Sequence, residues 1–117
     1  MTSNHIQSEP YFTIKEDGVP ARRVALTEFP CTIGRARDCD LVVDQTAVSR
    51  LHARLDFEHE QVTVTDLGST NGTYVNRQRL EPHRPRRLKS GDVINLGGEC
   101  ILEFDDPAAT ATIPLVD

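Results

Sequence analysis

The sequence of 117 residues contains no tryptophan, a single methionine and few aromatic side chains, which make up 5% of the chain. No apolar run approaches the ~20 residues that a membrane-spanning helix requires. Residues 1–10 also lack the basic and then apolar segments of a secretory signal. We therefore expect no membrane span and a cytoplasmic location. The length suits one domain and is too short for two ordinary ones.

Cysteines are scarce, and their spacing shows no pairs. There are three, an odd number, and no two form a Cys-x-x-Cys motif. A disulfide framework or a zinc ribbon needs pairs at regular spacing, so we interpret them as unmodified thiols in a reducing compartment. His5, His59 and His83 have no neighbours at metal-ligand spacing. We predict neither a metal site nor a cofactor.

The charge balance is acidic. The chain carries 13 basic and 18 acidic residues, a formal net charge of −5, which argues against general affinity for nucleic acid. Basic residues do concentrate between positions 77 and 89, but no aromatic side chains are interleaved there to stack on bases. We interpret this stretch as a solvated face and expect no nucleic-acid partner.

What the sequence has in abundance is short runs of β-branched and apolar residues separated by polar or glycine turns. In segment 53–58, Ala53, Leu55 and Phe57 alternate with polar residues, the pattern of a strand with one buried face. Segment 61–66 alternates in the same way. The runs that we predict to be strands are Tyr11–Lys15, Arg22–Leu26, Cys31–Gly34, Leu41–Val43, Ala53–Glu58, Gln61–Asp66, Thr73–Val75, Arg86–Leu88, Asp92–Leu96 and Glu99–Phe104.

Many short strands at this spacing predict an all-β sandwich or barrel. The strand order does not follow from the pattern. We place the domain at residues 10–105 and interpret residues 1–9 and 106–117 as flexible tails, the second of them acidic.

Three polar clusters fall between the predicted strands: Gly34-Arg35, Ser49–His52 and Ser69–Gly72. Loops at the end of a rigid sandwich are common places for binding groups. These clusters offer guanidinium groups, hydroxyls, an amide and glycines that allow close approach to backbone N–H groups. Such a set suits a dianionic phosphate, because arginine pairs with its oxygens bidentately and hydroxyl or backbone donors fill the remaining lone pairs.

The order and spacing of these clusters resemble those of the forkhead-associated (FHA) domain. The matching segments are Cys31–Arg35, Val48–Leu55, Val64–Asn76 and Leu88–Leu96, and the resemblance extends from Phe12 to Phe104. Each segment alone is a weak signal, but together and in this order they are specific. The resemblance implies an eleven-stranded β-sandwich of two sheets that recognises phosphothreonine in partner proteins.

The resemblance also implies roles for individual residues. Arg35, Ser49 and Arg50 would contact the phosphate, and Thr70 would lie near the phosphate and the threonine methyl group. Asn71 would bond the peptide backbone on either side of the phosphothreonine.

Three further residues would support the site. Gly34 would let the backbone turn so that Arg35 reaches the phosphate, and Gly72 would permit the turn into the next strand. His52 would brace the loops without touching the ligand.

Two other functions compete with this interpretation. Ser49, His52 and Asp66 could be arranged as a catalytic triad, but neither a Gly-x-Ser-x-Gly elbow nor a Gly-x-x-x-x-Gly-Lys phosphate loop accompanies them. We predict no enzymatic activity. The main alternative is a phosphate-independent interaction or scaffold domain, for example in secretion machinery.

The expected partner is a phosphothreonine-containing protein, a Ser/Thr kinase or its substrate, with the chain acting as an adaptor in kinase signalling. The oligomeric state stays open, as does the choice between a stand-alone adaptor and one domain of a longer protein.

The C-terminal tail contains two threonines, Thr110 and Thr112, in a segment without strand character. We hypothesise that a Ser/Thr kinase phosphorylates one of them and that the product engages the same site, within one molecule or between two. An unmodified tail is the alternative.

Overall fold

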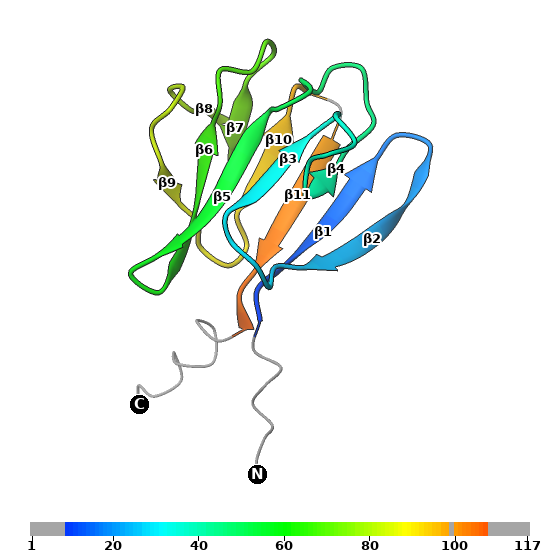
Figure 1. Cartoon of the computed structure of the whole chain (residues 1–117). Helices are drawn as coiled ribbons and strands as arrows, with labels where there is room; N and C mark the ends of the chain where they lie inside the picture. The colour runs from blue at the N-terminus through cyan, green and yellow to red at the C-terminus, as the bar shows by residue number, and fades with distance from the viewer. Residues whose placement is uncertain (1–8, 99, 108–117) are drawn as a thin grey trace.

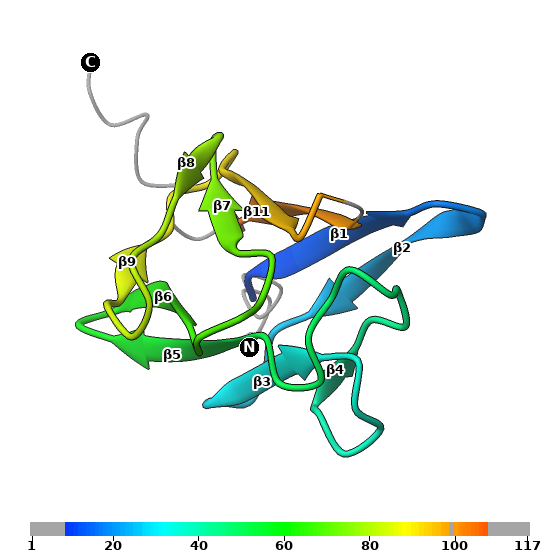
Figure 2. The same ribbon diagram turned by 90° about the horizontal axis from the view of Figure 1, so that it is seen from above.

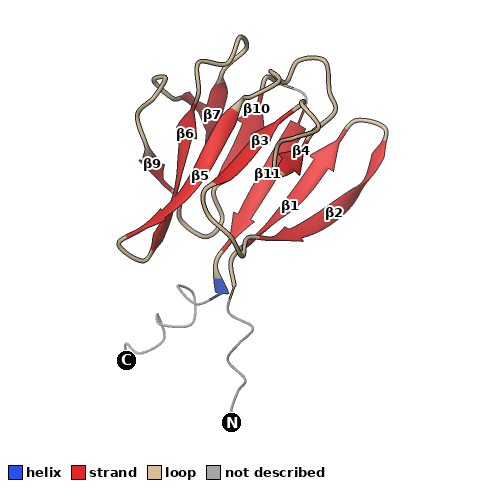
Figure 3. Cartoon of the chain, viewed as in Figure 1, coloured by secondary structure: helices blue, strands red, loops and turns tan. Residues whose placement is uncertain are grey.

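The computed structural model describes residues 9–98 and 100–107, which form two β-sheets packed face to face (Figure 1). The six-stranded sheet has the order β2 (Val19–Ala25), β1 (Tyr11–Glu16), β11 (Cys100–Asp105), β10 (Val93–Leu96), β7 (Thr73–Val75) and β8 (Gln78–Arg79). The five-stranded sheet has the order β4 (Leu41–Val42), β3 (Cys31–Gly34), β5 (Ala53–Glu58), β6 (Gln61–Asp66) and β9 (Arg86–Arg87). Strands carry nearly all of the regular structure (Figure 3). No helix among the described residues is long and apolar enough to cross a membrane.

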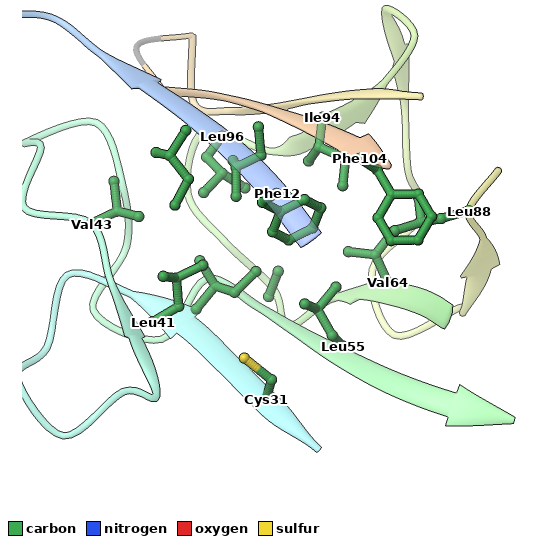
Figure 4. Close-up of a cluster of buried hydrophobic side chains, with 14 of the residues drawn as sticks. Phe12, Cys31, Leu41, Val43, Leu55, Val64, Leu88, Ile94, Leu96 and Phe104 are labelled. Carbon is green, nitrogen blue, oxygen red and sulfur yellow. The ribbon is translucent and has the colours of Figure 1, made fainter. Parts of the chain in front are cut away.

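The core lies between the two sheets, where alternate residues of each strand point inward (Figure 4). In β11, for example, Cys100, Leu102 and Phe104 are buried and the residues between them are partly exposed. Phe12 of β1 meets Phe104 edge to face, with ring centroids 5.8 Å apart. Burying such aliphatic and aromatic surface is the main stabilising term of a sandwich this small.

The predicted fold class is confirmed: the chain is an all-β sandwich of eleven strands in two sheets. All ten predicted strands are present; four have the predicted bounds, and the ends of five others differ by one residue. The second strand differs more, because it begins at Val19, three residues before the predicted start. The sequence pattern missed β8, a two-residue strand whose residues are both exposed and which pairs only with β7.

The prediction that Phe57 lies on the buried face of β5 is wrong. Its side chain is 51% exposed and packs against Phe29, with ring centroids 5.6 Å apart. The alternation of buried and partly exposed residues in β5 ends at Asp56, because Phe57 and Glu58 are both exposed. In β6 the two threonines of the supposedly polar face, Thr63 and Thr65, are buried as well.

All three cysteines are buried free thiols. Burial raises the pKa of Cys31 to about 11 and that of Cys100 to about 12, so both stay protonated at neutral pH. The thiolate is the reactive form, and these side chains therefore act as small core residues.

The polar clusters of the sequence gather at one end of the sandwich. The chain leaving β3 and the β4–β5, β6–β7 and β10–β11 connections all lie at the upper end in Figure 1. The described chain enters β1 and leaves β11 at the opposite end, where Tyr11 pairs with Asp105. Figure 2, which looks down on the loops, shows the β4–β5 connection crossing toward the six-stranded sheet.

Candidate functional site

A cleft of about 310 Å³ opens among these loops. It contains all five residues for which the sequence predicted ligand contact. Its lining residues are Arg35, Thr46, Ala47, Val48, Ser49, Arg50, Thr70 and Asn71. Segments far apart in the sequence therefore converge on one hollow.

Gly34 allows two of these segments to approach closely. The backbone N–H of Arg35 donates to the carbonyl of Ser49 (2.9 Å), and that of Ala36 donates to the carbonyl of Arg50 (3.1 Å). A Cβ atom at Gly34 would overlap the carbonyl oxygen of Arg50 and lie 2.8 Å from its carbonyl carbon. The φ angle of Gly34 is not in the left-handed range. Close approach, rather than the predicted turn, is thus the physical reason for a glycine here.

A hydrogen bond to the main chain fixes the side chain of Arg35 at the mouth of the cleft. Its Nε donates to the carbonyl of Val48 at 3.0 Å. This bond fixes the direction of the guanidinium while its two Nη groups keep their hydrogens unpaired among the described residues. Arg50 is also exposed, and its guanidinium has no described partner. The cleft is therefore bordered by two cations that form no ion pair with a carboxylate in the described part of the chain.

Ser49 connects the β4–β5 loop to its neighbours. Its Oγ accepts the backbone N–H of Thr70 at 3.0 Å. The hydroxyl hydrogen of Ser49 has no acceptor among residues 9–98 and 100–107, so it can donate into the cleft. Asn71 donates one amide hydrogen to the carbonyl of Ala47 at 2.9 Å. Its second hydrogen and its Oδ1 have no described partner, which leaves a donor and an acceptor for an extended peptide.

His52 is fully buried beneath the cleft. Its Nδ1 accepts the backbone N–H of Ser49 at 3.0 Å, and its Nε2 donates to the carbonyl of Gly72 at 3.0 Å. Both contacts require the neutral Nε2–H tautomer. Burial lowers the pKa of His52, which favours that neutral form. Gly72 itself has φ +91, a conformation that glycine adopts without strain. Both residues lie beside the cleft, and their role in supporting a ligand site stays a prediction.

Asp66 organises the loop that carries Thr70 and Asn71. Its Oδ1 accepts the hydroxyls of Ser69 (2.6 Å) and Thr73 (2.7 Å), and its Oδ2 accepts the backbone N–H groups of Gly68 and Ser69. Burial alone would raise the pKa of Asp66, but these donors outweigh it and the pKa is lowered. Sequence reasoning missed this role, although Asp-Leu-Gly-Ser after a strand is a signal for an Asx turn.

The alternative triad is not assembled. Both ring nitrogens of His52 are engaged by main-chain groups, so neither can take a proton from the Ser49 hydroxyl. Asp66 directs its carboxylate to Ser69 and Thr73 rather than to the imidazole.

Comparison of the sequence with known protein families identifies the family of the chain. The sequence model of the FHA domain matches residues 31–97, more than half of the chain, so the chain belongs to the FHA domain family. The resemblance recognised in the sequence is thereby confirmed.

Two curated relatives illustrate the similarity. The chain is 41% identical over 70 residues to the FHA domain-containing protein FhaB of Mycobacterium tuberculosis, a match that covers 60% of the chain and 45% of that protein. It is 39% identical over 86 residues to the oxoglutarate dehydrogenase inhibitor of Corynebacterium glutamicum, covering 74% and 58% respectively. The chain thus spans about half the length of these relatives.

Among solved structures, the chain is similar to an FHA domain from a structural and functional analysis of phosphothreonine-dependent FHA domain interactions. The TM-score is 0.69 at 32% identity, over 81% of this chain and 95% of the other.

Proposed function

We propose that the chain is a non-catalytic module that binds phosphothreonine-containing peptides in the cleft around Arg35. The observation that carries this proposal is the arrangement of unpaired donors. The guanidinium of Arg35 forms a hydrogen bond with the described chain through Nε alone. Arg50 and the Ser49 hydroxyl line the same cleft of 310 Å³. Because hydrogen bonds within the protein already fix the loops, ordering them on binding costs little.

The expected affinity is micromolar. A hydrogen bond to a charged group contributes roughly 1.5–3 kcal/mol net, so three of them would supply about 5–9 kcal/mol, and a micromolar complex corresponds to about −8 kcal/mol. Loss of the phosphate removes most of this binding free energy. Preference for threonine over serine is a smaller effect, since one buried methyl group contributes about 0.8 kcal/mol. Ala47 and Val48 line the cleft and offer apolar surface for that methyl group.

The test is fluorescence anisotropy with a degenerate set of labelled peptides in phosphothreonine, phosphoserine and unmodified forms. We expect micromolar binding confined to phosphothreonine, and a loss of about 100-fold in Arg35→Ala, since two charge-assisted bonds of ~1.5 kcal/mol disappear. Arg87→Ala is the matched control, because Arg87 is an exposed arginine of β9 outside the cleft. Binding indifferent to phosphate and to Arg35 would overturn the proposal and favour the phosphate-independent scaffold.

The absence of catalysis is part of the proposal. It is supported by the unassembled triad and by membership of a family of binding modules. We further propose a Ser/Thr kinase or its substrate as the partner, and residues 10–105 as the independently folding unit.

The tail threonines, Thr110 and Thr112, lie outside the described residues. We propose them as kinase sites that then engage the cleft of a neighbouring molecule. β11 ends at Asp105, at the end of the sandwich away from the cleft. An extended chain gains at most ~3.5 Å per residue, so Thr110 reaches about 17 Å and Thr112 about 24 Å from Asp105. The six-residue β11 alone spans about 20 Å.

Thr110 therefore falls short of the cleft of its own molecule, and Thr112 reaches only a little beyond the length of β11 when the tail is fully extended. This limited reach favours engagement between molecules. Intact mass after kinase treatment, followed by sedimentation, tests this hypothesis. Phosphate uptake that persists in the double variant Thr110→Ala, Thr112→Ala, or a phosphorylated chain that stays monomeric, would contradict it.

A further inference from the structure

A carboxylate lies on the core-facing side of β1, at the end of the strand that is nearer the cleft (Figure 1). Glu16 is the last residue of β1 and pairs with Cys100 of β11, so it continues the buried row that contains Phe12 and Ile14. Its side chain is only 7% exposed. A buried charge is costly unless other groups pair with it, so a carboxylate in an otherwise apolar row requires partners.

Both oxygens of this carboxylate have partners, and these come from different segments. Its Oε2 accepts a hydrogen bond from Nη2 of Arg22 at 3.2 Å, and the same Nη2 donates to the carbonyl of Val42 at 3.1 Å. Its Oε1 accepts a hydrogen bond from Nε2 of Gln45 at 3.2 Å. Arg22 lies in β2 and Val42 in β4, which are edge strands of the two sheets. Glu16 therefore connects the six-stranded sheet to the β4–β5 connection.

Gln45 begins a turn, residues 45–48, that forms part of the cleft. Its carbonyl accepts the backbone N–H of Val48 at 3.0 Å. Two carbonyls of this turn hold side chains that face the cleft: that of Ala47 accepts from Asn71, and that of Val48 accepts from Nε of Arg35. The position of the 45–48 turn therefore determines where both side chains are held.

The 45–48 turn also contacts the connection that follows β10. An added Cβ atom at Gly97 would overlap the carbonyl oxygen of Ala47 and lie 3.2 Å from its Cβ atom. This contact limits how closely the turn approaches the six-stranded sheet, but it does not prevent the turn from moving away. The hydrogen bond from Gln45 to Glu16 supplies an attractive contact with the same sheet.

We propose that Glu16 is a positioning residue for the cleft. It acts through Gln45 and holds the 45–48 turn, so that Arg35 and Asn71 are in place before a ligand arrives. This inference rests on the proposed function of the cleft, although Glu16 is not among the residues that line it. Without the carboxylate, binding would include the cost of ordering the turn, which corresponds to about a three- to tenfold loss of affinity.

Glu16→Leu, made in the full chain, separates this role from a contribution to stability alone. Leucine suits a core-facing position, and an apolar side chain in place of a buried charge often leaves stability unchanged. Arg22 is 42% exposed, so water can solvate it when its partner is lost. We expect urea unfolding close to that of the wild type, together with the stated loss of affinity for phosphothreonine peptides in anisotropy measurements.

Glu103→Leu is the matched control. Glu103 also lies in the six-stranded sheet and pairs with Lys15 at 2.9 Å, but its side chain is 40% exposed and makes this ion pair on the outer face. The same substitution there should retain wild-type affinity. An equal loss of affinity in both variants would overturn the proposal, because a general effect of lost charge would then explain it.

Gln45→Ala tests the connection itself, and it also serves if Glu16→Leu does not fold. Gln45 lies outside the strands, so the variant should fold and bind as weakly as Glu16→Leu. The double variant should bind no more weakly than either single variant, because both changes remove the same hydrogen bond. Losses of affinity that multiply in the double variant would overturn the proposal.

Exchange of the Arg35 Nε hydrogen with solvent, followed by NMR without ligand, measures the positioning directly. The hydrogen bond to the carbonyl of Val48 protects this hydrogen. Exchange should be faster in Glu16→Leu and in Gln45→Ala, by a factor similar to the loss of affinity, and unchanged in Glu103→Leu. A variant that loses stability alone, without movement of the turn, would not show this local change.

The outcomes separate this proposal from that of the cleft. If Arg35-dependent binding is intact in both Glu16→Leu and Gln45→Ala, the positioning role is overturned and the cleft stands. If no phosphothreonine peptide binds the wild type, the proposal of the cleft falls, and the exchange measurement alone decides whether Glu16 holds Arg35 in place. Unchanged exchange in both variants then overturns that role, and faster exchange supports it.

Discussion

At the end of the sandwich that holds the cleft, side chains join each loop to the main chain of its neighbour, whereas at the opposite end the chain reverses in a tight hairpin. His52 bonds two different loops through its two ring nitrogens. By contrast, the β5–β6 hairpin turns at His59 and Glu60, whose φ angles of 52° and 63° suit a two-residue turn that needs no help from elsewhere.

The difference shows where rigidity depends on distant contacts. A hairpin is specified locally, so a substitution there has a local cost. The cleft loops are specified by buried hydrogen bonds between segments some twenty residues apart, such as that between His52 and Gly72. A single change beneath the cleft should therefore affect both stability and binding.

The largest effect is expected for His52→Ala. The substitution leaves the N–H of Ser49 and the carbonyl of Gly72 unpaired and opens a cavity, at a cost of about 4 kcal/mol in the free energy of unfolding. His59→Asn, at the opposite end, should cost little, because asparagine tolerates positive φ. Urea unfolding of both variants measures the contrast. Equal losses in the free energy of unfolding would show that the stability of the cleft end depends no more on distant contacts than that of the hairpin end.

A smaller loss is expected for Gly34→Ala. The new methyl group would meet the backbone of Arg50, and separating the two loops should cost about 2–3 kcal/mol and weaken phosphopeptide binding. Gly18→Ala is the control for backbone strain without a clash, since Gly18 has φ +78 and open space around it. It should cost about 1 kcal/mol and leave binding unchanged. Unfolding curves and anisotropy give both quantities, and intact binding in Gly34→Ala would count against the close approach as a requirement of the site.

Acidification should weaken the fold through the same histidine. Burial lowers the pKa of His52 in the folded state, so as pH falls below ~6.5 the unfolded chain takes up the proton first. The free energy of unfolding then decreases by at most about 1.4 kcal/mol per pH unit until the folded-state pKa is reached. Asp66 does not contribute in this range, because its own pKa is lowered.

Urea unfolding of the wild type and of His52→Gln between pH 7.5 and 5.5 measures this dependence. The variant should lack the decrease in the free energy of unfolding on acidification. If the pH dependence of the variant is parallel to that of the wild type, groups other than His52 cause the decrease.

The smallest predicted effect is a gain in stability from a substitution outside the cleft. The hydroxyl of Thr65 is buried in β6 and has no hydrogen-bond partner among the described residues. Thr65→Val keeps the shape and removes this penalty, so we expect a stabilisation of about 1 kcal/mol with unchanged peptide affinity. Thermal unfolding measures the change in stability, and anisotropy measures the peptide affinity. A destabilised variant would mean that bound water forms a hydrogen bond with the hydroxyl of Thr65.

Local patterns predicted much of this molecule, and tertiary contacts decided the rest. The alternation of β5 and β6 and the clusters around Arg35 and Ser49 predicted the sandwich and the cleft, because both are encoded within a few residues. The exposure of Phe57 could not be predicted, since it depends on the tertiary packing at the end of β5 and not on the alternation within the strand. The short β8 depends on pairing with β7.

The neighbouring positions of Tyr11 and Asp105 have a mechanical consequence. β1 and β11 are antiparallel and hydrogen-bonded to each other, and the described chain enters and leaves at the same end of the pair. In an antiparallel pair the hydrogen bonds lie perpendicular to the strands, so a tension applied across these two ends would load them one after another. The domain should therefore peel open under a small force, beginning at the end remote from the cleft.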